Sequence, residues 1–262
     1  MVIKSYFCEV QTISFILRRI WCIWFFLIGL LSFLVLYPFF IFFLSRECWF
    51  KHAWKLKKLW AHIILFFSGI FYTIKKEGKI DKNAPYVICP NHSSYLDIVL
   101  TNIAFPNYFH FMGKAELLSI PLFNIFFKRM NIPVNRGSIK ASHKAFERAK
   151  DDIDKNIGIA IFPEATIPEC APKLGPFKNG AFRLAIEKQI PVVPVTFLDN
   201  WKIFPDTEGS RFLCMPGISR VIISKPIETK GMTDSDVSQL RQTVHEIIQA
   251  NLLKHGCQRK NC

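Results

Sequence analysis

A histidine and an aspartate five residues apart follow an apolar, strand-like run in the first half of the chain. In the stretch YVICPNHSSYLD a strand would end at Pro90, and a helix can begin at Ser93 or Ser94. On one continuous helix His92 and Asp97 would point to different faces, because five residues turn a helix by about 500°. If His92 instead lies in the turn before the helix, Asp97 can accept a hydrogen bond from one imidazole nitrogen. The other nitrogen would then be available as a general base.

The same residues also fit a helix N-terminus that carries no chemistry. The spacing from Ser94 to Asp97 resembles a capping box, in which the two residues exchange hydrogen bonds with each other's backbone. His92 would then be a surface residue of the preceding loop. An isolated HxxxxD pattern does not decide between the two interpretations, so the rest of the chain has to.

Further polar blocks follow downstream, several of them at the ends of short β-rich runs. They read KAEL, IPVNRGS, IFPEAT, FKNGA and VPV in that order. A guanidinium placed after a buried strand, as at Arg136, suits a bidentate grip on a phosphate. The carboxyl ends of strands are also where α/β folds bind ligands. The alternatives are a surface salt bridge for Arg136 and a helix-capping acid for Glu164.

In this order and spacing the blocks resemble the glycerolipid acyltransferase family, and most closely the bacterial 1-acylglycerol-3-phosphate acyltransferases, over roughly residues 60–225. The resemblance implies that His92 is the general base toward a glycerol hydroxyl and that Asp97 orients it. The hydroxyl would attack the carbonyl of an acyl thioester, carried by coenzyme A (acyl-CoA) or by acyl carrier protein. It implies a lysophospholipid acceptor, no covalent acyl-enzyme and no cofactor.

The resemblance also implies a set of acceptor-binding residues. Arg136 in the second block would bind the acceptor phosphate with Lys114 as a further candidate, and Glu164 would help to hold the acceptor. The full set expected to bind substrate is Lys114, Asn135, Arg136, Gly137, Glu164, Thr166 and Lys178. We expect no metal site, since the chain lacks HExxH and its eight cysteines include no CxxC pair. We expect those cysteines to be free thiols.

The third block departs from the family pattern FPEGTR, because Ala165 replaces the glycine and Ile167 replaces the arginine. An alanine fits here if this position needs neither a positive φ nor a close approach of another backbone, and we expect that it needs neither. If the usual arginine contacts the acceptor phosphate, that contact is missing here, and Lys173, Lys178 or Arg183 would have to replace it. An acceptor that is non-phosphorylated or amino-acid-headed therefore remains an alternative to lysophosphatidic acid.

The chain is both basic and apolar, which predicts contact with a lipid surface. It carries 34 Lys and Arg against 20 Asp and Glu, and 26 of its 262 residues are Phe. An uncharged run over Ile20–Leu44 would reach roughly 37 Å as a helix, enough to cross a bilayer core. A second run, Leu59–Ile74, would reach only about 24 Å as a helix and has lysines on both flanks. We expect a helical anchor that dips into one leaflet, with one transmembrane helix plus a buried core helix as the alternative.

The charge alone is also compatible with a basic membrane-surface module that has no enzymatic activity. Nucleic acid is not an expected partner, because the aromatic residues concentrate in uncharged runs rather than alternating with basic ones. We expect the protein at a membrane, on the cytoplasmic face of the bacterial inner membrane.

The remaining chain alternates strand-like and helix-like segments, which predicts an α/β domain with a mostly parallel sheet flanked by helices. We place a membrane-anchoring segment at residues 1–80 and the α/β acyltransferase domain at 81–262, with a C-terminal amphipathic helix over Thr233–Lys254. The expected strands are Tyr86–Cys89, Tyr108–Met112, Ile132–Asn135, Gly158–Phe162, Val192–Phe197 and Ile218–Ser224. The expected helices are Ser94–Ile103, Ala115–Lys128, Ile139–Asn156 and Asn179–Lys188.

Overall fold

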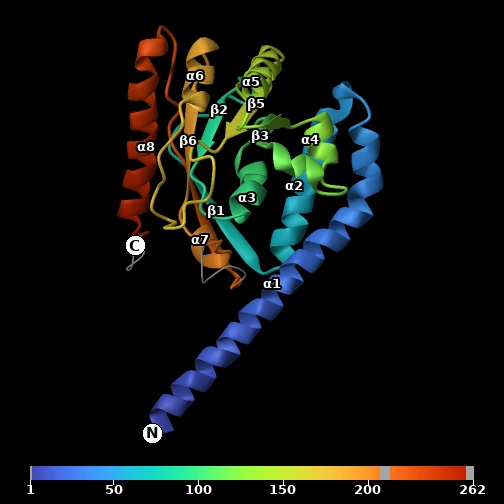
Figure 1. Ribbon diagram of the computed structural model, residues 1–262, viewed down its shortest axis with the longest axis vertical. Coiled ribbons are helices and arrows are strands. Elements are labelled where there is room, and N and C mark those ends of the chain that lie inside the picture. The colour runs from blue at the N-terminus through green and yellow to red at the C-terminus, as the bar shows by residue number, and fades with distance from the viewer. Residues whose placement is uncertain (1, 207–212, 258–262) are drawn as a thin grey trace.

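A seven-stranded, mostly parallel sheet forms the centre of the molecule in the computed structural model, which describes residues 2–206 and 213–257 (Figure 1). The strand order is β1-β7-β6-β2-β5-β3-β4, and β6 and β7 are the one antiparallel pair of neighbours. The strands are β1 (Ile70–Lys76), β2 (Val87–Pro90), β3 (Phe109–Lys114), β4 (Ile132–Val134), β5 (Gly158–Ile161), β6 (Val192–Phe197) and β7 (Gly217–Ile223). The predicted fold class is therefore confirmed.

Helices cover both faces of the sheet (Figure 1). One face packs against α2 (Phe50–Phe67) and α3 (Leu96–Ala104), and the other packs against α5 (Ile139–Asp154), α6 (Gly180–Glu187) and α8 (Val237–Lys254). The central strand β2 shows why both layers are needed: Ile88 belongs to the first core, whereas Val87 and Cys89 belong to the second. A strand buried on both faces is apolar along its whole length, which is how this one reads in the sequence.

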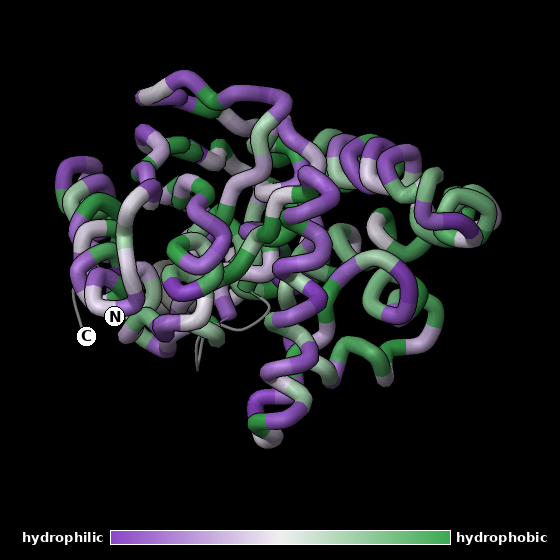
Figure 2. Tube along the Cα trace, turned by 90° about the horizontal axis from the view of Figure 1, so that it is seen from above, coloured by the Kyte–Doolittle hydropathy of each residue, from purple (hydrophilic) through white to green (hydrophobic). Residues whose placement is uncertain are grey.

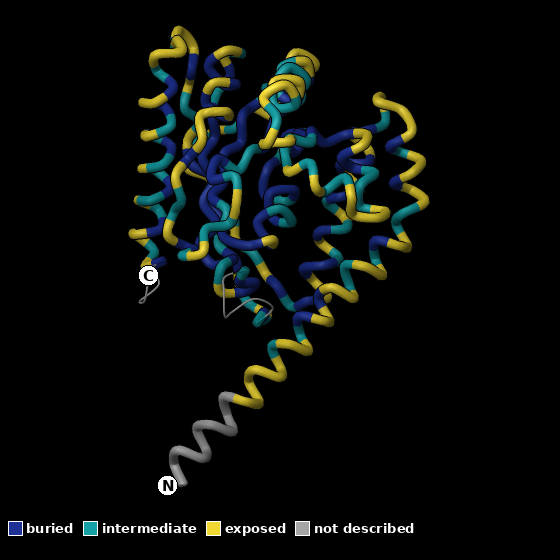
Figure 3. Tube along the Cα trace, in the orientation of Figure 1, coloured by how far each residue is buried: buried dark blue, intermediate teal, exposed yellow. Residues whose placement is uncertain are grey.

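The long helix α1 (Val2–Phe43) forms a hairpin with α2 and packs through one stripe of its surface. Within residues 12–43 of this helix, the buried side chains are Cys22, Phe25, Phe33 and Phe40. The opposite side exposes large apolar residues, as the alternation of colours along α1 in Figure 3 shows. Seen from above, hydrophobic residues gather on the side of the molecule that holds α1, α2 and α4 (Ile125–Arg129) (Figure 2). By length and composition, Thr12–Phe43 could cross a membrane, and 17% of its most apolar window is buried.

The predicted helix over Leu59–Ile74 is wrong in its second half. α2 ends at Phe67, and Gly69 turns the chain with a φ of +64° into strand β1, which pairs with β7 along its whole length. The turn needs glycine because an L side chain is strained at that φ. Strand β1 thus joins the sheet from within residues 1–80, and the boundary at residue 80 stays a prediction.

The structure also corrects two further expectations, one about a helix and one about the cysteines. The helix predicted over Ala115–Lys128 is divided into a 3₁₀ turn (Ala115–Ser119) and α4, because Pro121 and the positive φ of Leu122 interrupt it. Five described cysteines are free thiols: Cys22, Cys48, Cys89, Cys214 and Cys257. Cys170 is disulfide-bonded, so the expectation of free thiols is wrong at that residue.

Candidate functional site

The polar residues singled out in the sequence meet at one edge of the sheet. Strands β6, β2, β5, β3 and β4 are neighbours in that order and run parallel, so their carboxyl ends lie along the same edge. His92 follows β2, Glu164 follows β5, Lys114 ends β3 and Arg136 follows β4. Asn200, which the sequence analysis did not single out, follows β6 at the same edge. Ligands of open α/β sheets bind at this edge. The edge therefore holds the candidate site.

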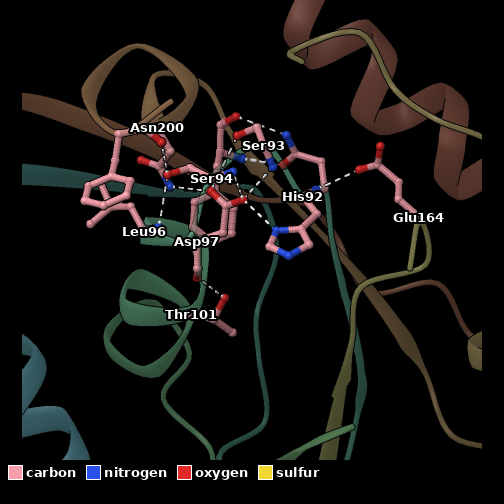
Figure 4. A network of polar contacts seen from close by, with 11 residues as sticks. His92, Ser93, Ser94, Leu96, Asp97, Thr101, Glu164 and Asn200 are labelled. Atoms are coloured by element: carbon pink, nitrogen blue, oxygen red, sulfur yellow. Dashed lines mark hydrogen bonds and ion pairs between the residues drawn. The ribbon is translucent and has the colours of Figure 1, made fainter. Parts of the chain in front are cut away.

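His92 lies in the turn between β2 and α3 and contacts Asp97, the second residue of that helix. The distance from His92 Nδ1 to Asp97 Oδ2 is 3.1 Å (Figure 4). An ionised carboxylate can only accept, so Nδ1 donates this hydrogen bond, and in a neutral imidazole the lone pair is then on Nε2. The ring of His92 also stacks on Phe162, with 4.2 Å between ring centroids. The turn thus brings together two side chains that a continuous helix would separate.

The carboxylate of Asp97 is completely buried and receives several hydrogen bonds. Oδ2 accepts from the backbone N–H groups of Ser93, at 2.6 Å, and of Ser94, at 2.8 Å. Oδ1 accepts from the side-chain amide of Asn200 at 2.7 Å (Figure 4). The bond from Ser94 is one half of the capping geometry that the sequence also suggested, so helix capping and contact with His92 coexist in one carboxylate.

Glu164 connects the turn of His92 to the loop after β5. Oε1 accepts from the backbone N–H of His92 and Oε2 from that of Gly175, each at 2.7 Å. Burial raises the pKa of Glu164 to about 7, because the charged form loses hydration, and the two backbone N–H groups partly oppose that shift. Glu164 therefore contacts the backbone of His92 rather than its imidazole ring.

Arg136 joins the second block to the third, since its Nη1 donates to the carbonyl oxygen of Ala165. Asn135 shapes the same turn, where its Oδ1 accepts from the backbone N–H of Gly137 at 3.0 Å. Ala165 has a φ of +69°, so the expectation that this position needs no positive φ is wrong. The alanine occupies a backbone conformation that favours the glycine usual in the family.

The remaining candidates are dispersed around this edge. Lys114, Thr166 and Lys178 expose their side chains, and the backbone N–H of Lys178 donates to Pro163. Arg183, considered as a substitute for the missing arginine, lies on α6 and forms an ion pair with Asp234 at 3.0 Å. Within residues 2–206 and 213–257, no group of three or more His, Cys, Asp or Glu side chains is arranged to hold a metal ion.

Sequence reasoning missed Asn200, which is fully buried against Asp97. The available signal was weak: a polar Asp-Asn pair directly after a strongly apolar strand, at the end where α/β sheets bind ligands. The fold and the site together define a parallel α/β domain with an oriented histidine–aspartate pair at the carboxyl edge of its sheet.

Comparison with known proteins identifies the family. The family model described as Acyltransferase matches residues 72–198, which identifies that part of the chain as an acyltransferase domain. It is 32% identical over 176 residues to the chloroplastic 1-acyl-sn-glycerol-3-phosphate acyltransferase BAT2 of Brassica napus, covering 66% of this chain and 49% of that protein. It is 30% identical to the 1-acyl-sn-glycerol-3-phosphate acyltransferase of Helicobacter pylori, over 53% of this chain and 59% of that one.

A solved structure shares the fold. The 1-acyl-sn-glycerophosphate (LPA) acyltransferase PlsC from Thermotoga maritima superposes with a TM-score of 0.76 and 21% identity, covering 96% of this chain and all of that one. The chain spans about half the length of the plant relatives that it matches. The resemblance to the glycerolipid acyltransferase family is confirmed, and the roles of individual residues remain predictions.

Proposed function

We propose that this protein is a membrane-bound acyltransferase that moves a fatty acyl group from a thioester to the free hydroxyl of 1-acyl-sn-glycerol 3-phosphate, giving phosphatidic acid. The observation that carries the proposal is the hydrogen bond between His92 Nδ1 and buried Asp97, at the edge of the sheet where the family blocks meet. Similarity to 1-acyl-sn-glycerol-3-phosphate acyltransferases from a plant chloroplast and from a bacterium supports the same acceptor.

The proposed reaction needs one base and no covalent intermediate. His92 Nε2 removes the proton of the acceptor hydroxyl while its oxygen attacks the thioester carbonyl, because an alcohol is too weakly acidic to react unassisted. Asp97 stabilises the imidazolium that results. A carbon–oxygen bond forms and the carbon–sulfur bond breaks, and the proton passes from His92 to the departing thiolate.

The acceptor phosphate would lie beside Arg136, with Lys114 and Lys178 as further contacts. Arg136 already donates to Ala165, which leaves other donors of its guanidinium for a phosphate. Asn135, Gly137 and the Thr166 hydroxyl would complete the acceptor site at this edge of the sheet. The donor would be acyl-CoA or acyl carrier protein, both acidic partners for a basic protein.

The membrane would be contacted through α1 and α2, on the cytoplasmic face of the bacterial inner membrane. The exposed apolar side of α1 supports this contact.

A second candidate acceptor is a non-phosphorylated or amino-acid-headed lyso-lipid, which Ile167 at the position of the usual arginine favours. A panel of acceptors decides between them: a strong preference for lysophosphatidic acid removes the second candidate.

Acyl transfer by the purified protein tests the proposal. We expect His92→Ala to lower kcat by about 10²–10⁴-fold, which is the usual contribution of a general base, and Asp97→Ala to lower it strongly as well. His143→Ala is the matched control, because this exposed histidine lies on α5 beside Glu147. Undiminished transfer by His92→Ala would falsify the mechanism, and no transfer by the wild type to any lyso-lipid would overturn the function.

A further inference from the structure

We infer that Asn200 and Ser219 are positioning residues that hold the Asp97 carboxylate in the orientation His92 requires, an inference that rests on the proposed function. A chain of three short contacts leads inward from the imidazole. Asp97 Oδ2 lies 3.1 Å from His92 Nδ1, Asn200 Nδ2 donates to Asp97 Oδ1 at 2.7 Å, and Ser219 Oγ donates to Asn200 Oδ1 at 2.5 Å. The chain extends the histidine–aspartate pair by two residues from elements remote in sequence.

The Asp97 carboxylate fixes which way the amide of Asn200 points, and the Ser219 hydroxyl is compatible with that orientation. Asp97 accepts when ionised, so it selects the NH₂ end, and the Ser219 hydroxyl can donate to the carbonyl end. A flipped amide would place its oxygen against a carboxylate and its NH₂ against a hydroxyl. Since the carboxylate selects the NH₂ end and the Ser219 hydroxyl can donate to the carbonyl end that remains, the amide of Asn200 is a directed donor to Asp97.

The two oxygens of Asp97 have separate tasks, and Asn200 serves the one that does not face His92. Oδ2 contacts the imidazole and two backbone N–H groups, whereas the other contact of Oδ1 is a long 3.5 Å bond from the Ser93 hydroxyl. Without Asn200, Oδ1 loses its short hydrogen bond, and the carboxylate is freer to rotate about χ2. Such a rotation moves Oδ2 away from His92.

Burial and a rigid support make this arrangement effective. The side chains of Asp97, Asn200 and Ser219 are all inaccessible to water, which therefore cannot replace a lost hydrogen bond. Asn200 begins the short helix α7 (Asn200–Ile203), and Ser219 lies on β7. The preceding residue, Asp199, binds the Arg220 guanidinium on β7 through two bonds of 2.7 and 2.8 Å, which fixes α7 to the strand.

Kinetics of Asn200 variants in the full-length protein test the inference. We expect Asn200→Ala to lower kcat about 10–100-fold while the KM values of donor and acceptor stay within about twofold, because no substrate contact is removed. In an Asp97→Ala background the same substitution should cost less than about twofold, since the group that it positions is gone. Asn200→Asp keeps the shape and the acceptor for Ser219 but loses the donor, so it should reduce kcat at least as much.

Asn107→Ala is the matched control, because Asn107 is also buried and donates two hydrogen bonds, to Asp81 and Ala84, outside the site. It should lower the thermal midpoint and leave kcat unchanged. If Asn200→Ala does not fold, Ser219→Ala replaces it, with a kcat loss of about 3–10-fold that also vanishes in the Asp97→Ala background.

The outcomes separate the two proposals. Wild-type kcat in Asn200→Ala, or an equal loss with and without Asp97, overturns the positioning role while acyl transfer stands. Absence of His92-dependent acyl transfer in the wild type overturns the proposed function instead.

Discussion

Ala165 is the residue whose backbone is most at odds with its side chain in the candidate site. A non-glycine residue in the left-handed region costs about 1–2 kcal/mol, and glycine costs about 0.5–1 kcal/mol in lost chain entropy. Ala165→Gly should therefore be neutral or raise the free energy of unfolding by up to about 1 kcal/mol, and the Arg136 bond to its carbonyl should persist. Thermal unfolding of the purified protein measures this effect.

The same substitution in a helix supplies the control. Ala141→Gly on α5 should destabilise by about 1 kcal/mol, because Gly is a poor helix former. If both variants lose the same stability, the strain assigned to Ala165 is absent.

Glu164 gives the site a pH dependence whose sign follows from its burial. Its pKa is raised from the ordinary 4.5 to about 7 in the folded protein, so the folded state binds the proton more tightly than the unfolded chain does. Stability should therefore fall as pH rises from about 4.5 to 7, by on the order of 3 kcal/mol, and stay level above.

The difference in unfolding free energy between the wild type and Glu164→Gln isolates this contribution, since other titrating groups cancel. Unfolding by urea at several pH values between 4 and 8 provides the measurement. We expect the free energy of unfolding of the wild type to fall relative to that of Glu164→Gln as the pH rises from about 4.5 to 7. A difference that is flat or rises with pH contradicts the assignment.

Among the elements, α1 is held to the domain by aromatic packing along one stripe. Phe40 is fully buried and meets Phe126 of α4 edge-on, with 4.8 Å between ring centroids. Phe40→Ala should cost about 3–5 kcal/mol, the usual loss for a buried phenylalanine. Thermal unfolding and protease cleavage near the α1–α2 connection would both report it.

The neighbouring Phe39 is the matched control, because it is 55% exposed and lies about 100° around the same helix from Phe40. Phe39→Ala removes the same atoms from a position that we assign to lipid, so it should leave the packing of α1 on α2 unchanged. Equal destabilisation by the two variants would mean that α1 is not held by one stripe.

The elements that the sequence predicted well are those whose pattern is local. Strand β2 and helix α5 follow from an apolar run and from an amphipathic repeat, and both lie close to their expected positions. The helix predicted over residues 59–74 was wrong in its second half because hydrophobicity alone does not distinguish the last turns of an apolar helix from an apolar edge strand. The glycine at 69 and the pairing of β1 with β7 decide it, and that pairing joins residues about 150 positions apart.

The residues of the candidate site also divide into those that a local sequence pattern predicts and those that only the tertiary structure brings together. His92, Glu164 and Arg136 were predictable, because each follows a strand and parallel strands bring their ends together. Asn200 and Ser219 were not, because their contacts with Asp97 and with each other exist only in the tertiary structure. No local pattern marks a buried amide as a donor to a carboxylate 103 residues away.

For the molecule as a whole, the positive charge around the anchor is less available to lipid than the sequence suggests. Lys57 is buried between the rings of Phe111 and Phe126, and burial lowers its pKa to about 7. Lys58 donates to the carbonyl of Phe105 at 2.9 Å. These two lysines connect α2 to the domain, whereas Lys51 and Lys55 stay exposed for contact with an anionic leaflet.

The position of α1 against the domain favours a helix that dips into one leaflet over one that crosses it. The indoles of Trp21 and Trp24 donate to carbonyls at the end of α2, and Arg18 donates to Leu213. A segment tied in this way cannot be surrounded by lipid on all sides.

We therefore predict that both ends of the chain lie on the same side of the membrane. Protease added to sealed vesicles that hold the full-length protein, tagged at each end, should cleave both tags of a molecule or neither, whichever way the molecule is inserted. A transmembrane α1 would instead leave each molecule with one tag cleaved and the other protected. Vesicles opened with detergent, in which both tags must be cleaved, provide the control. A predominance of singly cleaved molecules would contradict this prediction and would mean that α1 spans the membrane.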